Sequence, residues 1–294
     1  MTGRSPKFVA GQLNTYTSPA DASAVGRALR MAGRRVLLVP TMGALHEGHL
    51  TLVRMAKRVP GSVVAVSIFV NPLQFGEGED FARYPRTWEQ DLDICADHGV
   101  DVVFAPTADD LYAGGAQITV DPGPLGAVLE GAARPGHFRG VLTVVAKLLH
   151  IMACDTAVFG EKDYQQLVLI RAMIATLNIP TRAVGAPTVR DSDGLAMSSR
   201  NAYLSPAERK TATAIPRATA AALSAAERGA NAETVVDVAT DILRAEPGVE
   251  PDYVVVTDPD LGPAPSSGPA RLLVAARVGP PRLLDNVPLV LAPR

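Results

Sequence analysis

Short, largely apolar runs, separated by segments of helical character, constrain the fold of this chain more than any other feature. The runs lie at Val36–Val39, Val63–Val70, Val100–Ala105 and Ala157–Phe159, and a further strand is predicted at Ala183–Val189. Nearly continuous apolar strands are typical of a parallel sheet that is covered on both faces. Because such strands alternate with helical segments over roughly 185 residues, the sequence predicts an α/β fold with a Rossmann-like parallel sheet.

Apolar spacing and cap residues predict the helices between these strands. One helix begins near Pro19, and Thr87 with Gln90 forms a candidate capping box for another. The segment Val141–Met152 is apolar enough for a helix buried in the core, and a further helix is expected over Leu167–Leu177.

The pattern changes after residue 186. Helices are predicted from Ser205 onwards and over Ala232–Ala245, and strands at Tyr253–Thr257, Leu272–Val278 and Leu289–Leu291. We therefore expect two domains. Residues 1–186 would form a Rossmann-like catalytic nucleotide-binding domain, and residues 187–294 a smaller α+β domain that forms a lid over the active site.

The segment Pro40–Leu50, PTMGALHEGHL, is predicted to be the turn between the first of these strands and a helix. Gly43 and Gly48 allow the backbone to approach a ligand closely, and the start of the helix offers N–H groups and the positive end of its dipole. His46 and His49 are three residues apart, which places both imidazoles on one face of the first helical turn. This combination indicates a phosphate-binding site.

Other interpretations of the two histidines compete with this one. A zinc-protease signature needs histidines at positions i and i+4, but the second histidine here comes one residue too early. Neither GxxxxGK[ST] nor GxGxxG occurs in this segment, so the Walker loop and the dinucleotide fingerprint do not apply. A purely structural role, in which both side chains only cap or pack the helix, remains the alternative.

Polar residues follow two of the predicted strands at their carboxyl ends, where the ligand crevice of an open parallel sheet lies. Asn71 and Gln74 follow the second strand; their amides suit a small polar substrate, although such residues are also common in turns. Lys162 follows the fourth strand and supplies the compact cation that phosphoryl transfer uses. The other polar residues after that strand are Gly160, Glu161, Asp163, Gln165 and Gln166.

Further along the chain, the polar segment Arg190–Asn201, RDSDGLAMSSRN, can wrap a triphosphate through Ser198, Ser199 and Arg200. The alternative is an interdomain linker. Several other polar groups have no single interpretation. Residues 76–86 form either a lid or a solvated loop, Asp91 and Asp93 are either magnesium ligands or solvated helix carboxylates, and the cluster Arg134, His137 and Arg139 has no assigned role.

Composition excludes several classes of partner. The net charge is −2 and no block of Lys or Arg occurs, so neither nucleic acid nor a membrane surface is an expected partner. Cys95 and Cys154 are the only cysteines and form no CxxC, which argues against a disulfide framework or a zinc knuckle. The amino-terminal residues lack the apolar core of a signal peptide, and no apolar run reaches membrane-spanning length. We expect a cytoplasmic location.

These motifs resemble those of a known family. HEGH at residues 46–49 is similar to the HxGH signature of the nucleotidyltransferase superfamily, and LAMSSR at residues 195–200 resembles its KMSKS-type loop. More specifically, the sequence resembles the pantothenate synthetase family from about Val36 to Asn286, in both the order and the spacing of its motifs. The matching segments are PTMGALHEGH, SIFVNPLQF, GHFRGVLTVVAKLL, FGEKDYQQL, DGLAMSSRNAYL and RLLDN.

The resemblance implies an activity. Members of this family ligate (R)-pantoate to β-alanine with ATP, through a pantoyl-adenylate intermediate, and release AMP and pyrophosphate. The resemblance also implies a requirement for Mg²⁺ and a homodimer. Two departures from the family pattern stand out. Gln90 replaces one of the acidic residues that often precede the position of Asp91, and Pro281 stands where threonine is common.

The resemblance also implies roles for individual residues. His49 would act as an acid with His46 as its partner. Together with these histidines, Lys162 would stabilise charge on the phosphates, and Ser198, Ser199 and Arg200 would bind the outer phosphates. The ATP site would comprise Pro40, Thr41, Met42, Gly43, His46, Gly48, His49, Gly160, Lys162, Asp163, Val189, Met197, Ser198, Ser199 and Arg200. The substrate site would comprise Gln74, Gln166, Asn71 and Met42, and Asp91 would be the magnesium ligand.

Two rival functions are distinguished by their chemistry. Another HxGH nucleotidyltransferase, acting on a phosphate substrate, would need a basic pocket where this chain has Asn71, Gln74 and Gln166. A nucleotide-binding regulator without catalytic activity would not need the histidines, Lys162 and the paired serines that this chain retains.

Overall fold

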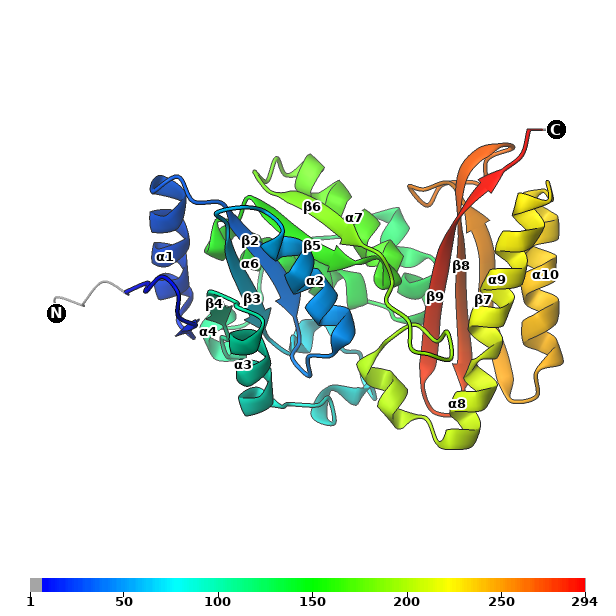
Figure 1. Cartoon of the computed structure of the whole chain (residues 1–294), viewed down its shortest axis with the longest axis horizontal. Helices are drawn as coiled ribbons and strands as arrows, with labels where there is room; N and C mark the ends of the chain where they lie inside the picture. The colour runs from blue at the N-terminus through cyan, green and yellow to red at the C-terminus, as the bar shows by residue number, and fades with distance from the viewer. Residues whose placement is uncertain (1–6, 294) are drawn as a thin grey trace. The chain divides into compact units, whose positions relative to one another are not determined.

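The computed structural model describes residues 7–293, and the chain divides into two compact units (Figure 1). The first unit comprises Met1–Glu161 with Leu169–Ala186, and the second comprises Lys162–Val168 with Pro187–Arg294. In the described range, none of the helices combines the length and the apolar character needed to cross a bilayer.

The first unit contains a parallel sheet, so the predicted α/β fold with a Rossmann-like sheet is confirmed. Within residues 7–293 this sheet has six strands in the order β1-β4-β3-β2-β5-β6, all joined in parallel register. The strands are β1 (Asn14–Tyr16), β2 (Val36–Thr41), β3 (Val63–Ile68), β4 (Val102–Phe104), β5 (Thr156–Gly160) and β6 (Arg182–Ala186).

Strand order reverses beside β2, at the centre of the sheet. Chain order runs outward from β2 to β3 and β4 on one side, whereas β5 and β6 lie on its other side. In an open parallel sheet, the crevice outside the carboxyl ends of the strands at such a switch point is the usual ligand site. The turn after Thr41 and the residues after Gly160 leave the sheet at this point.

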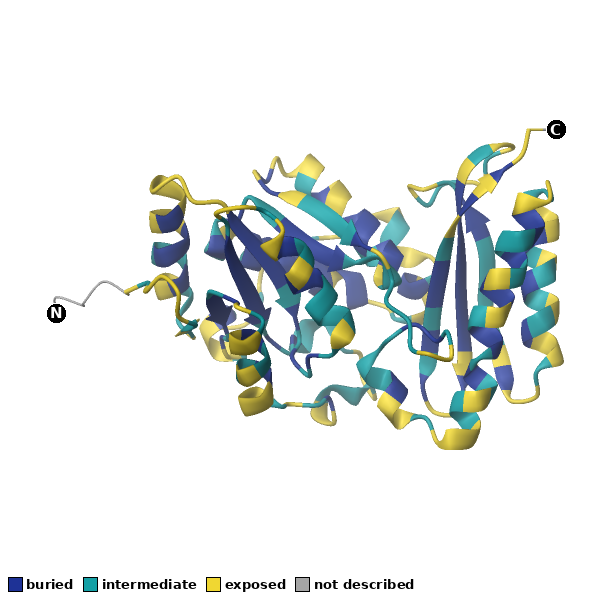
Figure 2. Ribbon diagram, in the orientation of Figure 1, coloured by how far each residue is buried: buried dark blue, intermediate teal, exposed yellow. Residues whose placement is uncertain are grey.

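Helices cover both faces of this sheet (Figure 1). On one face, Leu37, Val39 and Val66 pack against Leu52 and Val53 of α2. On the other, α1 and α6 pack against each other and α6 packs against β2. The central strands β2, β3, β4 and β5 are largely buried, whereas the edge strands β1 and β6 are partly exposed (Figure 2). The helices are α1 (Pro19–Met31), α2 (Glu47–Lys57), α3 (Trp88–Asp97), α4 (Ala108–Leu111), α5 (Glu130–Ala133), α6 (His137–Met152) and α7 (Tyr164–Thr176), of which α7 begins in the segment assigned to the second unit.

One glycine sets a close approach that matters for the site. A Cβ atom on Gly140 of α6 would lie 2.2 Å from the backbone oxygen of Leu73, in the short 3₁₀ helix η1 (Pro72–Gln74). A side chain at this position would therefore push η1 away from α6. The glycine lets the Asn71 side-chain Nδ2 donate a hydrogen bond to the carbonyl of Gly140, at 3.1 Å.

The second unit pairs an antiparallel sheet with alanine-rich helices. The sheet has the order β7-β8-β9, with β7 at Val249–Thr257, β8 at Gly268–Val278 and β9 at Arg282–Leu291. Three helices lie in the same unit: α8 (Pro206–Ala212), α9 (Ala214–Glu227) and α10 (Ala232–Ala245). Small alanine side chains of α9 are fully buried, which lets the helix lie close to the sheet.

One local prediction is wrong, and two predicted strands are present with different bounds. Thr87 precedes α3 as predicted, but no capping hydrogen bond from its side chain is present in the described chain; its hydroxyl donates to Asp91 instead. The strand predicted at Ala183–Val189 covers Arg182–Ala186. The last strand, predicted only at Leu289–Leu291, begins at Arg282, because its polar residues pair with other side chains inside the unit.

Candidate active site

The histidine turn starts from the end of the central strand. The last two residues of β2 are Pro40 and Thr41, and Met42 begins the turn. The hydroxyl of Thr41 donates to the carbonyl of Ser67 in β3 at 2.7 Å and accepts from the N–H of Gly43 at 3.2 Å. Gly43 has a φ of +81°, a conformation that strongly favours glycine. The threonine thus ties the turn to the neighbouring strand.

A buried carboxylate shapes the next two residues of the turn. Asp91 of α3 is 1% exposed, and it accepts from the N–H of Ala44 at 3.0 Å, the N–H of Leu45 at 2.8 Å and the hydroxyl of Thr87 at 3.2 Å. Ala44 has a φ of +50°, which is unfavourable for an L-residue and is held by these bonds. A Cβ on Gly43 would come within 2.9 Å of the same carboxylate.

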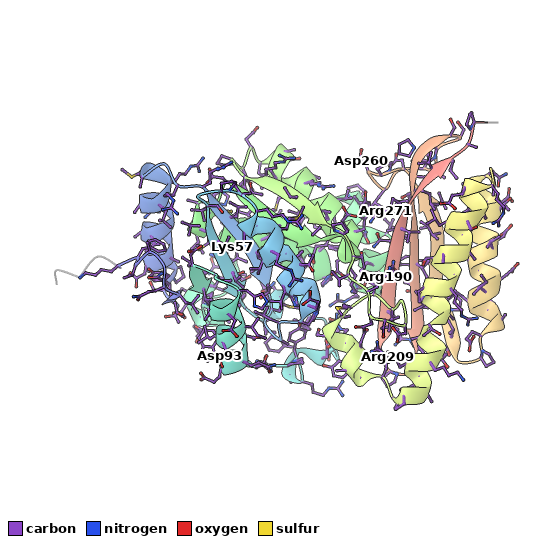
Figure 3. All side chains as sticks on the ribbon, viewed as in Figure 1. Lys57, Asp93, Arg190, Arg209, Asp260 and Arg271 are labelled. Atoms are coloured by element: carbon purple, nitrogen blue, oxygen red, sulfur yellow. The ribbon has the colours of Figure 1, made fainter. Side chains whose placement is uncertain are left out.

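This geometry favours a structural role for Asp91 over the predicted magnesium ligand. Three donors already occupy its two oxygens. Among residues 7–293, no group of three or more His, Cys, Asp or Glu side chains is placed to hold a metal ion. Asp93, the other candidate, has an exposed side chain on α3 (Figure 3).

Both histidines cap the helix that follows. His46 is the N-cap of α2, and its Nδ1 accepts from the N–H of Gly48 at 3.1 Å. The Nδ1 of His49 accepts in turn from the N–H of His46 at 3.3 Å, and the ring centroids are 4.1 Å apart. Because Nδ1 is an acceptor in both rings, the proton of each neutral imidazole is on Nε2. The structural and functional interpretations are therefore compatible: each ring caps the helix through Nδ1 and can donate through Nε2.

The amide residues after β3 form a linked group with the turn. Gln74 donates through Nε2 to the sulfur of Met42 at 3.2 Å, and its Oε1 accepts from the Nδ2 of Asn71 at 3.1 Å. Asn71 is 1% exposed, and its Oδ1 accepts from the hydroxyl of Tyr112 at 2.9 Å. Burial raises the pKa of Tyr112, so its hydroxyl remains a donor. Asn71 is thus placed to orient Gln74, and the half-buried Gln74 is the better candidate for direct contact with a substrate.

A second network of hydrogen bonds holds the backbone of Gln74. It includes Arg134 and His137, for which the sequence indicated no role. The Gln74 carbonyl accepts from Nη2 of Arg134 at 3.2 Å and from Nδ1 of His137 at 2.8 Å. Arg134 also pairs with Glu79, and this hydrogen bond lowers the pKa of the Glu79 carboxyl. The third basic residue of the predicted cluster, Arg139, has an exposed side chain.

In the second unit, Lys162 and Asp163 belong to the short 3₁₀ helix η4 (Glu161–Asp163). The Lys162 ammonium lies 3.4 Å from the carboxylate of Asp163, and the Lys162 carbonyl accepts from the Nδ2 of Asn286 at 2.9 Å. On α7, Gln165 is buried and Gln166 is half-buried.

The segment Arg190–Asn201 is an ordered turn of the second unit. The N–H of Met197 donates to the carbonyl of Val189 at 2.9 Å, and the N–H of Asp191 donates to the carbonyl of Leu195 at 2.9 Å. Ser198 caps the 3₁₀ helix η5 (Ser199–Tyr203) by accepting from the N–H of Arg200 at 3.3 Å. This turn therefore presents Ser198, Ser199 and Arg200 from a defined backbone.

An ion pair that sequence reasoning missed anchors this turn. Arg190 donates to both oxygens of Asp285 in β9, at 2.6 and 2.9 Å, and also to the carbonyl of Gly194 (Figure 3). The hydrogen bond to Asp285 raises the pKa of the Arg190 guanidinium. The motif RLLDN contains Asp285, but no local pattern indicates its partner because the two residues are 95 positions apart.

Neither cysteine fits a catalytic role. Burial raises the pKa of the Cys95 thiol to about 12 and that of the Cys154 thiol to about 12. A thiol with such a pKa carries almost no thiolate at neutral pH, and the thiolate is the nucleophile.

The predicted site residues thus form two sets. The first unit brings one set to the carboxyl ends of β2, β3 and β5: Pro40, Thr41, Met42, Gly43, His46, Gly48, His49, Asn71, Gln74 and Gly160. The second unit holds Lys162, Asp163, Gln166, Val189, Met197, Ser198, Ser199 and Arg200. That both sets act on one ligand stays a prediction.

Known proteins are similar to this chain over most of its length. A family model for pantoate-beta-alanine ligase matches residues 14–288. Pantothenate synthetase of Mycolicibacterium smegmatis is 60% identical over 284 residues, which cover 97% of this chain and 90% of that relative. The crystal structure of pantothenate synthetase from Thermus thermophilus has a TM-score of 0.86 at 44% identity and covers 93% of this chain and 98% of that one. Pantoate-beta-alanine ligase from Francisella tularensis, complexed with beta-gamma ATP and beta-alanine, has a TM-score of 0.77 at 33% identity and covers 94% of this chain and 97% of that one.

The family match begins at β1 and ends within β9, so it includes the histidine turn, the amide residues after β3, Lys162 and the turn at Arg190–Asn201. The similarity therefore extends through both compact units. The chain belongs to the pantoate–β-alanine ligase family, the family of the pantothenate synthetases.

Proposed function

We infer that this chain condenses (R)-pantoate with β-alanine at the expense of ATP, through a pantoyl-adenylate intermediate, and releases AMP and pyrophosphate. The observation that carries this conclusion is the histidine turn at the switch point of the sheet, in a chain that matches the ligase family over residues 14–288. The relative from Francisella tularensis, solved with beta-gamma ATP and beta-alanine, supports the same substrates here.

In the first step, a carboxylate oxygen of pantoate attacks the α-phosphorus of ATP, and pyrophosphate leaves. Positioning and charge stabilisation dominate such a reaction. The Nε2–H groups of His46 and His49 supply donors from the first unit, and the amino-terminal end of α2 contributes the positive end of the helix dipole. Lys162 supplies positive charge, and Ser198, Ser199 and Arg200 bind the outer phosphates. His49 is the residue proposed to act as an acid.

Amide side chains suit the acid substrate. Pantoate carries hydroxyl groups and a carboxylate, and Gln74 and Gln166 can donate to both kinds of group. Gln74 is held at its side chain by Asn71 and at its carbonyl by Arg134 and His137, so its position is fixed before a substrate arrives. Asn71 is buried and is proposed to orient the side chain of Gln74 rather than to bind pantoate directly.

In the second step, the amine of β-alanine attacks the adenylated carboxyl carbon, the amide bond forms and AMP leaves. Water competes for the same carbon, so the intermediate must be shielded from solvent. The segment 187–294 is proposed to serve as the lid that provides this shielding. The turn at Arg190–Asn201 supports that role because it joins a phosphate-binding sequence to the rest of the segment.

Magnesium is proposed to enter with ATP. The described side chains do not form a protein-held site, since Asp91 is occupied by three donors and no group of three ligands is present among residues 7–293. Mg²⁺ commonly keeps several waters and binds through substrate phosphates, where it neutralises their charge. Membership of the family further supports a homodimer and a cytoplasmic location.

Product analysis tests the function directly. Incubation with ATP, (R)-pantoate and β-alanine is expected to yield pantothenate, AMP and pyrophosphate in equal amounts by mass spectrometry. Without β-alanine, pyrophosphate release is expected to stop near one turnover, since the adenylate remains bound. A product that joins nucleotide and phosphate substrate would identify a different nucleotidyltransferase, and binding of ATP with no turnover would identify a regulator.

Replacing Lys162 tests how much its positive charge contributes to the rate of adenylation. Lys162→Ala is expected to lower the rate of adenylation by roughly 100- to 1,000-fold, as for the loss of other groups that stabilise developing charge. Pantoate-dependent exchange of pyrophosphate into ATP measures this step without β-alanine. Exchange at the rate of the unsubstituted chain would remove the lysine from the mechanism.

Measuring the free energy of unfolding distinguishes a structural role of Asp91 from a role as a magnesium ligand. Asp91→Ala leaves the N–H groups of Ala44 and Leu45 without their acceptor, so the free energy of unfolding is expected to fall by about 2–4 kcal/mol. Urea denaturation with and without Mg²⁺ measures this loss, which is expected not to depend on the ion. Asp93→Asn, on the exposed side of the same helix, is the matched control and is expected to change stability by less than about 0.5 kcal/mol. A stable Asp91→Ala protein with a raised requirement for Mg²⁺ would restore the metal-ligand assignment.

A further inference from the structure

Two consecutive residues of β9 point to opposite faces of the three-stranded sheet. Leu283 and Leu289 contribute to the core beneath the helices of the second unit. Because side chains alternate along a strand, Asp285 lies on that same face and Asn286 lies on the opposite one. Both polar side chains are buried, at 2% and 4% exposure, and both make specific contacts. Asp285 forms the ion pair with Arg190 that anchors the turn at Arg190–Asn201. The role of the buried side chain of Asn286 is a separate question.

Asn286 joins the sheet to the backbone of Lys162. Its Oδ1 accepts from Nε of Arg271 at 2.8 Å and also from Nη2 of the same guanidinium, while its Nδ2 donates to the Lys162 carbonyl at 2.9 Å. A guanidinium can only donate and a carbonyl can only accept. Only one orientation of the Asn286 amide therefore satisfies both neighbours. In the reversed orientation, its NH₂ group would face the Arg271 donors and its oxygen would face the Lys162 carbonyl.

Arg271 fixes the other end of this contact. It is 7% exposed, and its guanidinium carbon lies 3.9 Å from the ring centroid of Tyr164 (Figure 3). The hydroxyl of Tyr164 donates in turn to the carbonyl of Pro259 at 2.9 Å. Tyr164 is two residues beyond Lys162. Asn286 therefore holds the carbonyl of Lys162, and Arg271 packs against the ring of Tyr164, at the two ends of the segment 162–164.

The fixed backbone matters because a lysine side chain is long and flexible. Its ammonium sits at the end of a four-carbon stem, and each rotatable bond must be restrained to place the charge. Anchoring the carbonyl of Lys162 fixes the origin of that stem. A displacement of about 1 Å in a reacting group costs on the order of 100-fold in rate.

We propose that Asn286 is a positioning residue for the ligase reaction: it holds the backbone of Lys162 so that the ammonium reaches the phosphates during adenylation. The inference rests on the proposed function, which gives Lys162 its role. Asn286 itself touches neither substrate nor the reacting atoms, and it acts through the lysine.

Asn286→Asp separates the two contacts of the side chain. A carboxylate still accepts from Arg271, so the contact with the sheet is kept, but it cannot donate to the Lys162 carbonyl and repels it. A merely structural role predicts little loss. The positioning role predicts that the rate of pantoate-dependent pyrophosphate exchange falls by about 10- to 100-fold.

Lys162→Ala supplies the decisive comparison. In a chain that already lacks the ammonium, adding Asn286→Asp is expected to change the exchange rate by less than about two-fold, because both substitutions remove the same effect. Two substitutions whose losses multiply would overturn the proposal, as would an Asn286→Asp chain with unchanged exchange. Absence of pantoate-dependent exchange in the unsubstituted chain would instead reject the proposed function, so the two failures are distinguishable.

Controls cover folding and specificity. Asp252→Asn removes the negative charge that pairs with Arg282 in the same sheet and does not involve Lys162, so exchange is expected to stay within about two-fold. Circular dichroism and thermal unfolding verify that each variant folds. If Asn286→Asp does not fold, Asn286→Ala takes its place in the comparison; if neither variant folds, Asn286 is a folding residue and the proposal is wrong.

Discussion

The buried carboxylate of Asp91 is the interaction on which the candidate site depends most. It accepts from two successive amides of the turn and holds Ala44 in a conformation that an alanine does not favour by itself. Only after this bend can His46 take the N-cap position of α2 and receive the N–H of Gly48. The histidine turn is thus shaped by a residue of another helix, α3. Because its amides are already engaged, the turn is preorganised rather than ordered by a ligand.

The same design recurs at three other polar groups of the proposed site. Gln74 is fixed by Asn71 on its side chain and by Arg134 on its carbonyl, Lys162 is held by Asn286, and the serine turn is anchored through Arg190. The buried side chains of Asn71, Asn286 and Asp285 each form a hydrogen bond with a less buried residue: Gln74, Lys162 and Arg190, respectively. A transfer reaction controlled by positioning and charge needs this arrangement, because flexible side chains would lose much of their effect.

The sequence was sufficient for the parts of the molecule that depend on local pattern. Apolar runs predicted β2, β3, β4 and β5 and the parallel sheet, and the glycine and histidines of HEGH marked the turn at its switch point. Contacts between distant segments could not be predicted in this way. In the sequence, Asp91 has the appearance of a solvated helix carboxylate, and its bonds to Ala44 and Leu45 appear only in the structure. Strand β9 was predicted only over Leu289–Leu291, because the partners of its polar residues, Arg190 and Arg271, lie outside the strand. The capping role of both imidazoles likewise requires ring positions that spacing alone does not give.

We propose that imidazoles, an ammonium group and paired hydroxyls from separate segments act on the same triphosphate. A crystal structure of this chain with a non-hydrolysable ATP analogue and (R)-pantoate tests it most directly. The account predicts that Nε2 of His46 or His49, Nζ of Lys162 and a hydroxyl of Ser198 or Ser199 each lie within hydrogen-bonding distance of phosphate oxygens, with pantoate against Gln74. A nucleotide bound with its phosphates directed away from Lys162 and Ser198 would contradict it.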